Sequence, residues 1–520
     1  MAGGRTRAAA VVVAFAIAGC GGQSGATQSE GTTTNGEPRQ GGDLVFARPE
    51  DNTTMDPIVA VEQQTIFVMK HIYETLYVTS DDGQDVEPWL VTGHELSDDE
   101  LTWTFQLREG VMFHDGQEMT AEDVVFSIDR GRSEESGFGF LLAAIDTVEA
   151  TDDYTVTITT KYAWGPLLAD LALWSASIVP ADFGGMTAEE FFADPIGTGP
   201  FEFAEWNRGT NLKVTRFEDY WQEGKPYLDS VTWTQVPNAN TRIAQLQGGQ
   251  AHIISELPFN TIDSLAEAAD TDAEAFAATT NMFLMFNTTE EPFDDVHVRR
   301  AVAHAIDKEA MAQAVFFGHG EASCSVIAET IAYHDPETPC LDLDMAAAEE
   351  ELAQSSVPEG FATEFLIGDE PADVAIAEII QEQLAPLNID VEIRKVDPGQ
   401  FYETLSSYDY AMAYAGFGLD IPDPDEVVSF MLDFENGGGD SYSTGYDNPE
   451  MTELVRAAGR ALDDAERQEL YSQVQELHAQ EIPHFPLVSL TNPFAWRSNV
   501  QGFFVSPVGD RHLEDVWLSE

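Results

Sequence analysis

The stretch Tyr408–Phe430 holds an aspartate placed where it could bind a cation. Large apolar residues alternate with alanines from Tyr410 onward, which is typical of a buried strand. Gly416 and Gly418 then open the backbone just before Asp420. In open α/β sheets ligands bind at the carboxyl ends of the strands. The stretch therefore favours a ligand-cation site at Asp420, and the alternative is an ordinary turn aspartate in an Asp-rich chain.

Motifs of enzymes and of metal sites are missing from the sequence. There is no His-Glu-x-x-His, no Gly-x-Ser-x-Gly elbow and no phosphate-binding loop. The run Asp420-x-x-Asp423-x-Asp425 lacks the spacing of an EF-hand and its glutamate at position twelve. His297 and His304 share a helix face, but no third ligand accompanies them. The sequence favours a binding protein without metal or cofactor, and a tethered extracellular hydrolase is the alternative of another class.

The chain of 520 residues carries 92 acidic and 24 basic residues, a net charge of −68. The acidic residues are spread along the sequence instead of forming a disordered acidic block. Counter-ions in concentrated salt screen the repulsion among such charges, so a halophilic protein fits this pattern. Nucleic-acid binding is excluded because phosphate contacts need clustered Lys and Arg.

The first 20 residues are typical of an export signal. Basic Arg5 and Arg7 precede the uncharged run Ala8–Ile17, which is too short to span a bilayer permanently. Small residues then lead to Cys20, which resembles the lipobox of bacterial lipoproteins, where the cysteine carries the lipid. The alternative is an ordinary secretory signal with a chance cysteine. Residues 21–40, rich in Gly, Ser, Thr and Gln, are predicted to be a flexible tether.

Two further cysteines, Cys324 and Cys340, remain if Cys20 is lipidated. In an exported protein an isolated pair most simply forms a disulfide. Metal binding is the alternative, and only His319 and His334 lie nearby as ligands of the right kind.

Several elements can be assigned from local patterns. Thr120 with Asp123 forms a capping box at the start of a helix, and Phe361–Ile367 reads as a strand with one apolar face. Beyond residue 311, strands and helices alternate, which indicates a parallel or mixed sheet with right-handed crossovers. Asp425 is a plausible N-cap for a helix over Glu426–Leu432.

Several motifs in one order resemble the family 5 extracellular solute-binding proteins, the dipeptide- and oligopeptide-binding subunits of ABC importers. The resemblance covers roughly residues 41–520. The motifs are Phe113–Arg130 (FHDGQEMTAEDVVFSIDR), Pro195–Phe201 (PIGTGPF), Tyr220–Trp233 (YWQEGKPYLDSVTW), Thr241–Ile253 (TRIAQLQGGQAHI) and Phe283–Met311 (FLMFNTTEEPFDDVHVRRAVAHAIDKEAM).

This resemblance implies an α/β fold of the large two-lobe periplasmic-binding-protein type. The expected boundaries are a signal peptide over 1–20, a tether over 21–40, lobe I over 41–283 with a peripheral subdomain near 70–195, lobe II over 284–487, and a return to lobe I over 488–520. The chain is expected to cross between the lobes near Phe283–Phe286 and Leu487–Leu490, forming a two-strand hinge.

The resemblance also implies roles for particular residues. An Asp in a Gly-aromatic-x-x-Asp segment of the family holds the peptide's α-ammonium, which Asp420 would do here while Phe417 packs against the ligand. Weaker pocket candidates are Gln63 and Trp174. Relatives that bind dipeptides use an Arg in lobe II for the ligand's carboxylate, whereas the segment Gly368–Asp373 is acidic and has no Arg. The full set of expected ligand-binding residues is Asp420, Phe417, Gly416, Gly418, Trp174 and Gln63.

The expected partners are a peptide ligand, longer than a dipeptide, and the permease of an ABC transporter in the membrane. The protein would be a monomer outside the cytoplasm, held at the outer face of the membrane by its lipid. An oligosaccharide receptor of the same family is the alternative, in which Trp174, Phe417 and Tyr414 would stack on sugars.

Overall fold

The structure is a computed structural model that describes residues 36–436 and 439–520. The expected signal peptide, the lipidation site Cys20 and most of the tether lie outside the described residues. Among the helices of the described part, none is long and apolar enough to cross a membrane.

Lobe I is built on one half of a large mixed sheet. Strand β1 (Asp43–Arg48) lies at its centre and pairs in parallel with β10 and β11. Its apolar side chains pack in a core with helix α1 (Gln63–Met69), whose last five residues are all buried. The other elements of this half are β8 (Phe201–Asn207), β9 (Asn211–Arg216), β10 (Ser230–Gln235), α5 (Ala239–Gln247), β11 (Ile253–Ser255) and α6 (Ile262–Ala266).

A peripheral subdomain of lobe I has its own antiparallel sheet, in the order β4-β5-β7-β6. Alternating residues of β5 (Thr102–Leu107) and β7 (Thr155–Thr160) are buried, and they form a separate core beneath α2 (Ala121–Gly131). The predicted capping box is confirmed at the start of α2. The remaining elements are β2 (Tyr77–Thr79), β3 (Val86–Pro88), β4 (Val91–Leu96), β6 (Ile145–Asp152), α3 (Leu167–Asp170) and α4 (Ala188–Phe191).

Two long antiparallel strands, β12 (Thr271–Phe286) and β17 (His484–Arg497), run through both lobes. Their first shared section adjoins β11 of lobe I, and their second adjoins β16 of lobe II. Pairing is regular up to Ala277 and resumes at Asn281. This interruption lies a few residues before Phe283–Phe286, where the crossing between the lobes is expected.

Lobe II carries the other half of the sheet, in the order β15-β14-β16-β12. Strand β14 occupies Phe361–Ile367, as predicted, and is parallel to its neighbours β15 (Ile389–Lys395) and β16 (Met412–Phe417). The helices of this lobe are α7 (Val296–His304), α8 (Lys308–Phe316), α9 (Met345–Gln354), α10 (Pro371–Leu384), α11 (Pro398–Ser406), α12 (Asp425–Leu432), α13 (Asp440–Ser443), α14 (Pro449–Arg460) and α15 (Asp464–Glu481), and β13 (Glu321–Ala322) pairs with β17.

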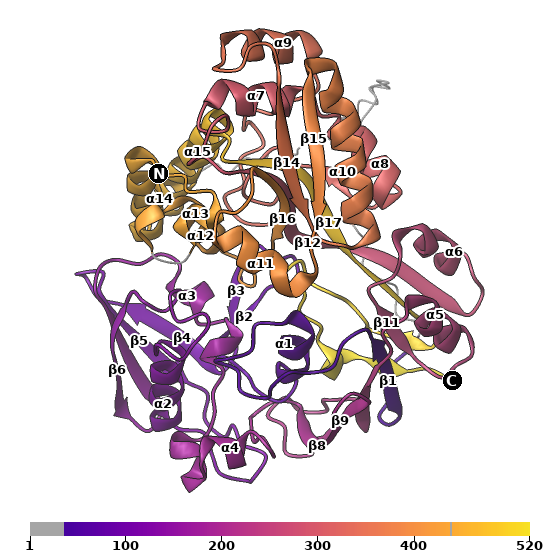
Figure 1. Ribbon diagram of the computed structural model, residues 1–520. Helices are drawn as coiled ribbons and strands as arrows, with labels where there is room; N and C mark the ends of the chain where they lie inside the picture. Colours follow the sequence, from indigo (N-terminus) through magenta and orange to yellow (C-terminus); the bar gives the residue numbers. More distant parts are fainter. Residues whose placement is uncertain (1–35, 437–438) are drawn as a thin grey trace, which may run out of the picture.

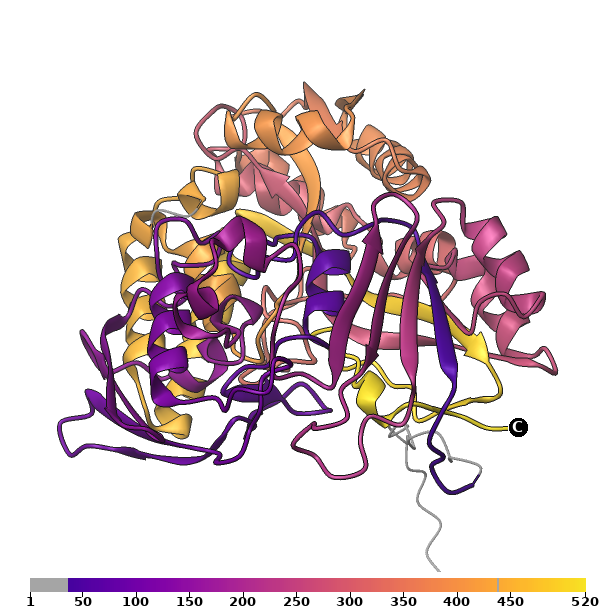
Figure 2. The same ribbon diagram turned by 90° about the horizontal axis from the view of Figure 1, so that it is seen from below.

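The lobes meet on the side of the peripheral subdomain. Helices α12, α14 and α15 lie beside this subdomain in both views (Figures 1 and 2). The amide of Gly165 donates to the carbonyl of Gly459 at 2.9 Å, and the guanidinium of Arg460 lies 4.7 Å from the centre of the Tyr162 ring. The structure therefore represents a form in which the two lobes are in contact.

Candidate ligand-binding site

The end of β16 is held very close to β12, which explains the two glycines. A Cβ on Gly416 would lie 2.5 Å from the sulfur of Met282, and one on Gly418 would lie 2.6 Å from Oγ1 of Thr280. No larger residue fits without a shift of these neighbours. The next residue, Leu419, exchanges two hydrogen bonds with the hydroxyl of Thr279, at 2.8 and 2.9 Å. The loop that carries Asp420 is thereby fixed to the hinge strand.

Helix α12 holds the other side of this loop. Oε2 of Glu426 accepts hydrogen bonds from the amides of Asp420, at 2.9 Å, and Ile421, at 3.2 Å. The N-cap of α12 is Pro424, so the expected N-cap Asp425 is instead the first helical residue. Its amide donates to Oδ1 of Asp423 at 2.9 Å, which closes the turn before the helix.

The carboxylate of Asp420 is half-buried, and the charges of Lys70 and Asp510 of lobe I act on it. Among the described residues, none donates a hydrogen bond to this carboxylate or forms an ion pair with it. Burial raises the pKa of Asp420 to about 7, nearby Lys70 opposes this rise and Asp510 adds to it. Lys70, at the C-terminal end of α1, forms an ion pair with Asp510. A ligand ammonium reaching Asp420 would supply the partner that the carboxylate lacks.

Phe417 belongs to an aromatic cluster that joins the lobes. Its ring is half-buried and lies 5.4 Å from that of Phe430 and 6.0 Å from that of Tyr442, measured between ring centres. Phe430 in turn lies 6.0 Å from Phe140 of the peripheral subdomain. Both lobes therefore contribute aromatic rings to the surroundings of Phe417, and its contact with a ligand remains a prediction.

One edge of β16 is open next to this cluster. Strand β14 pairs with β16 only at Met412 and Ala413, so within the described residues no strand covers the stretch from Tyr414 to Phe417 on that side. The hydroxyl of Tyr442 donates to the carbonyl of Gly416 at 3.3 Å. An extended ligand backbone could pair with this edge, as peptides do at exposed strands.

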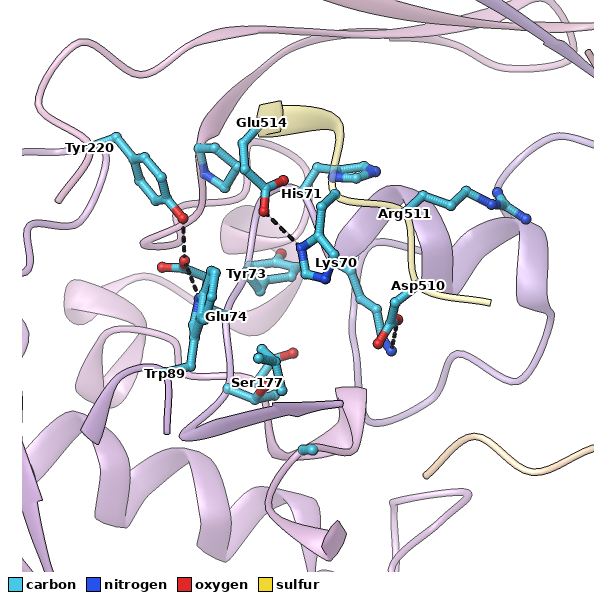
Figure 3. A pocket seen from close by; sticks show the side chains of 15 residues that line it. Lys70, His71, Tyr73, Glu74, Trp89, Ser177, Tyr220, Asp510, Arg511 and Glu514 are labelled. Atoms are coloured by element: carbon cyan, nitrogen blue, oxygen red, sulfur yellow. Dashed lines mark hydrogen bonds and ion pairs between the residues drawn. The ribbon is translucent and has the colours of Figure 1, made fainter. Parts of the chain in front are cut away.

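A cavity of about 60 Å³ lies behind Lys70 within lobe I (Figure 3). Lys70 and Asp510 lie at one side, and Glu74 with Tyr220 and Trp89 lies at the other (Figure 3). Burial raises the pKa of Glu74 to about 7, although Trp89 and Tyr220 donate hydrogen bonds to it at 2.7 and 2.8 Å.

A second charged pair borders the same cavity. Nδ1 of His512 lies 2.8 Å from Oε1 of Glu514. Burial opposes the charged form of the ring, but Glu514 outweighs it and raises the pKa of His512 to about 9. The cavity therefore has charges of both signs next to the Asp420 site.

Other sequence-predicted residues lie elsewhere. Trp174 is 1% exposed, its Nε1 donates to the carbonyl of Ala60 at 3.1 Å, and its ring packs against Phe138, so it is a core residue and not a ligand platform. Tyr414 is likewise buried in the core of lobe II. Gln63 is exposed at the start of α1.

Cys324 and Cys340 form a disulfide in lobe II, with their Cα atoms 4.9 Å apart. With Asp342 they form the only group of three potential metal ligands that the described residues bring together, but the bond leaves no thiolate to bind a metal.

Sequence reasoning missed Lys70, Asp510 and Glu426. Lys70 and Asp510 are 440 positions apart, and no local pattern connects them. Glu426 could have been noticed as an acidic residue in the first turn of the predicted helix, where carboxylates accept bonds from nearby amides.

Two lobes joined by a pair of strands, with an unpaired carboxylate on which charges of the opposite lobe act, define a solute receptor. The chain belongs to family 5 of the bacterial extracellular solute-binding proteins, because the model of this family's middle region matches residues 85–439.

Known proteins are similar to this chain over most of its length. It is 29% identical over 485 residues, 92% of this chain and 94% of the other, to the glutathione-binding protein GsiB of Salmonella paratyphi A. Among solved structures it resembles DppA of Helicobacter pylori in complex with the peptide STSA, with a TM-score of 0.81 and 27% identity over 93% of this chain and 99% of that one. It also resembles AppA of Bacillus subtilis in complex with a nonapeptide, with a TM-score of 0.78 and 26% identity over 93% of this chain and 100% of that one. The predicted two-lobe fold is confirmed.

Proposed function

We propose that this protein is the substrate-binding subunit of an ABC importer, that it captures peptides longer than dipeptides outside the membrane, and that it delivers them to the permease. The observation that carries the proposal is the half-buried carboxylate of Asp420, which has no hydrogen-bond donor or ion-pair partner among the described residues. A peptide's α-ammonium is the matching group. The open edge of β16 provides a place for the peptide backbone.

The charge of lobe II favours longer peptides. The segment after β14 is acidic, and burial, together with Glu370 and Asp369, raises the pKa of Asp373 to about 6. Arg394, on the neighbouring strand, is already paired with Glu364 and Asp409. The segment itself supplies no cation for a dipeptide's carboxylate. Lys395, an exposed residue beside Ile367 at the end of β15, is the one basic residue of these strands without an ion pair in the described structure. The relatives that bind the peptide STSA and a nonapeptide are consistent with this preference.

The same proposal includes an anchor. Cys20 would carry a lipid after removal of the residues that precede it, and the tether would keep the monomeric receptor near its permease. Lobe closure would then be a rigid-body rotation about the β12–β17 hinge.

Native mass spectrometry of the purified protein, exchanged from concentrated salt just before spraying, tests these points together. We expect bound species separated by amino-acid residue masses and a protein mass that starts at a lipid-modified Cys20. Adducts spaced by hexose or pentose units, or a protein that stays empty after incubation with a peptide library, would contradict the peptide assignment.

A further inference from the structure

Three carboxyl groups from the two lobes are buried where the lobes touch. Asp170 ends α3 of lobe I, while Asp425 and Glu426 begin α12 of lobe II, and their side chains act on one another electrostatically. Their residues are 1%, 3% and 0% exposed, respectively. We call these three residues the carboxyl contact. Such a group of like charges is rarely buried unless it is paired or neutral.

Two of these carboxyl groups have an oxygen without a partner in the described structure. Oδ2 of Asp170 accepts a hydrogen bond from Nε1 of Trp164 at 2.7 Å, but its Oδ1 has no partner. Oε2 of Glu426 accepts the two backbone amides of the Asp420 loop, but its Oε1 has none. A buried polar atom without a partner needs an explanation, and a proton on that oxygen would remove its charge.

Two nearby cations are paired with other carboxylates, and a third, Arg460, lies over the ring of Tyr162. Arg467 lies 2.9 Å from Asp423 and also donates to the hydroxyl of Tyr471 at 3.0 Å. Arg456 pairs with Asp433 at 2.7 Å. The other charged or titratable groups that act on this region are Asp420, Tyr162, Tyr333, Arg460 and, through Asp420, Lys70 with Asp510. None of the cations forms an ion pair with the carboxyl contact within the described residues.

The electrostatics agree with this geometry. Burial is the largest cause in each case: it raises the pKa of Asp425 to about 8, and it raises the pKa of Asp170 and of Glu426 well above the usual carboxyl range. A metal ion would need at least three ligand atoms close together, and the one such group in the described residues is Cys324, Cys340 and Asp342, at the disulfide. A proton is therefore the better occupant of this contact.

We propose that closing the two lobes takes up protons at the carboxyl contact, so that the closed form is favoured by acid and weakened as the pH rises. Opening exposes Asp170 and Asp425 to water, where a carboxyl group has its ordinary pKa near 4. Between about pH 4 and pH 8 the open form has lost protons that the closed form keeps. As the pH rises through this range, each held proton lowers the closing equilibrium constant by up to about tenfold per pH unit, and the contribution of Asp425 levels off above about pH 8.

Small-angle X-ray scattering of the ligand-free protein tests the proposal, because it needs no identified ligand. The radius of gyration is measured from about pH 5 to pH 9 at one fixed high salt concentration. We expect it to rise with pH in the wild type. In Asp170→Asn the amide still accepts the hydrogen bond of Trp164 but holds no titrating proton, so its curve should be flatter and remain nearer the closed value at pH 8.

Asp146→Asn is the matched control, since Asp146 is an exposed carboxylate of the same subdomain and its loss changes the net charge equally. Its curve should follow the wild type. If Asp170→Asn does not fold, Glu426→Gln tests the other side of the contact with the same expectation. A radius that is constant between about pH 5 and pH 9 in the wild type, or variants that follow the wild-type curve, would overturn the proposal. These measurements do not depend on peptide binding, so the proposed function could fail and this inference stand.

Discussion

Asp420→Asn should weaken the binding of peptides that have a free amino terminus. The substitution keeps the size of the side chain and removes the charge that would meet the ligand's ammonium. A hydrogen bond between charged groups contributes about 1.5–3 kcal/mol net, which corresponds to roughly 10- to 150-fold in Kd. Lys70 already neutralises part of the Asp420 charge, so the ligand does not have to overcome a fully isolated carboxylate.

The assay is isothermal titration calorimetry with a peptide identified by native mass spectrometry and with its N-acetylated form. Acetylation removes the ammonium, so the four combinations of protein and ligand form a double-mutant cycle. In wild type, acetylation should weaken binding by the full 10- to 150-fold. In Asp420→Asn, acetylation should change the Kd only slightly. Asp390→Asn, which changes an exposed carboxylate of β15 in the same lobe, is the control and should bind as wild type.

The pH dependence sharpens this test. Because the pKa of Asp420 is raised to about 7 in the free protein, its charged form is lost as the pH falls below about 7. The affinity difference between wild type and Asp420→Asn should therefore shrink by up to about tenfold for each pH unit below 7. Taking the difference removes the part of the carboxyl contact's effect that is the same in both proteins, but Asp420 also raises the pKa of Glu426 in that contact. Equal affinities of the two proteins at pH 7, or an unchanged loss on acetylation in the variant, would refute the role of Asp420.

Two further predictions concern stability. Replacing both Cys324 and Cys340 by Ser should lower the free energy of unfolding by about 3 kcal/mol, because the disulfide closes a loop with a sequence separation of 16; denaturant titration would show this loss, and no change would mean that the bond does not constrain the unfolded chain. The pKa of His512 is raised to about 9 beside Glu514, so its pairing should contribute at most about 3 kcal/mol below pH 6.5 and lose this as the pH rises through 9. His512→Gln should then remove that part of the pH dependence of unfolding, and parallel curves for variant and wild type would contradict it.

Much of the local structure could be predicted from the sequence because short-range patterns determine it. The apolar face of β14 gave its bounds directly, and the capping box placed the start of α2. The strand expected from Tyr410 instead begins at Met412. The side-chain amide of Asn287 donates to the carbonyls of Tyr408 and Tyr410, which takes them out of a strand ladder, and that contact comes from a distant segment.

Only the part of the site that lies in a single sequence segment could be predicted. Asp420 and Phe417 lie together at the end of β16, as expected from their spacing. Trp174 was misplaced because an apolar run in the sequence looks the same whether it lines a ligand site or fills a core. Lys70, Asp170 and Asp510 act on this site only through the tertiary fold, which brings them to it from the other lobe.

The interruption in the β12–β17 ladder has a mechanical consequence. On either side of it the two strands are joined by hydrogen bonds, so the connection should resist stretching. Between Ala277 and Asn281 the ladder is absent, which leaves a short section that can twist. Even there, Thr279 is bonded to Pro507 of the C-terminal segment and to Leu419 beside the site. A torque applied to one lobe by a docked permease would thus be concentrated a few residues from Asp420. A twist at this point would weaken ligand binding at Asp420 without separating the lobes.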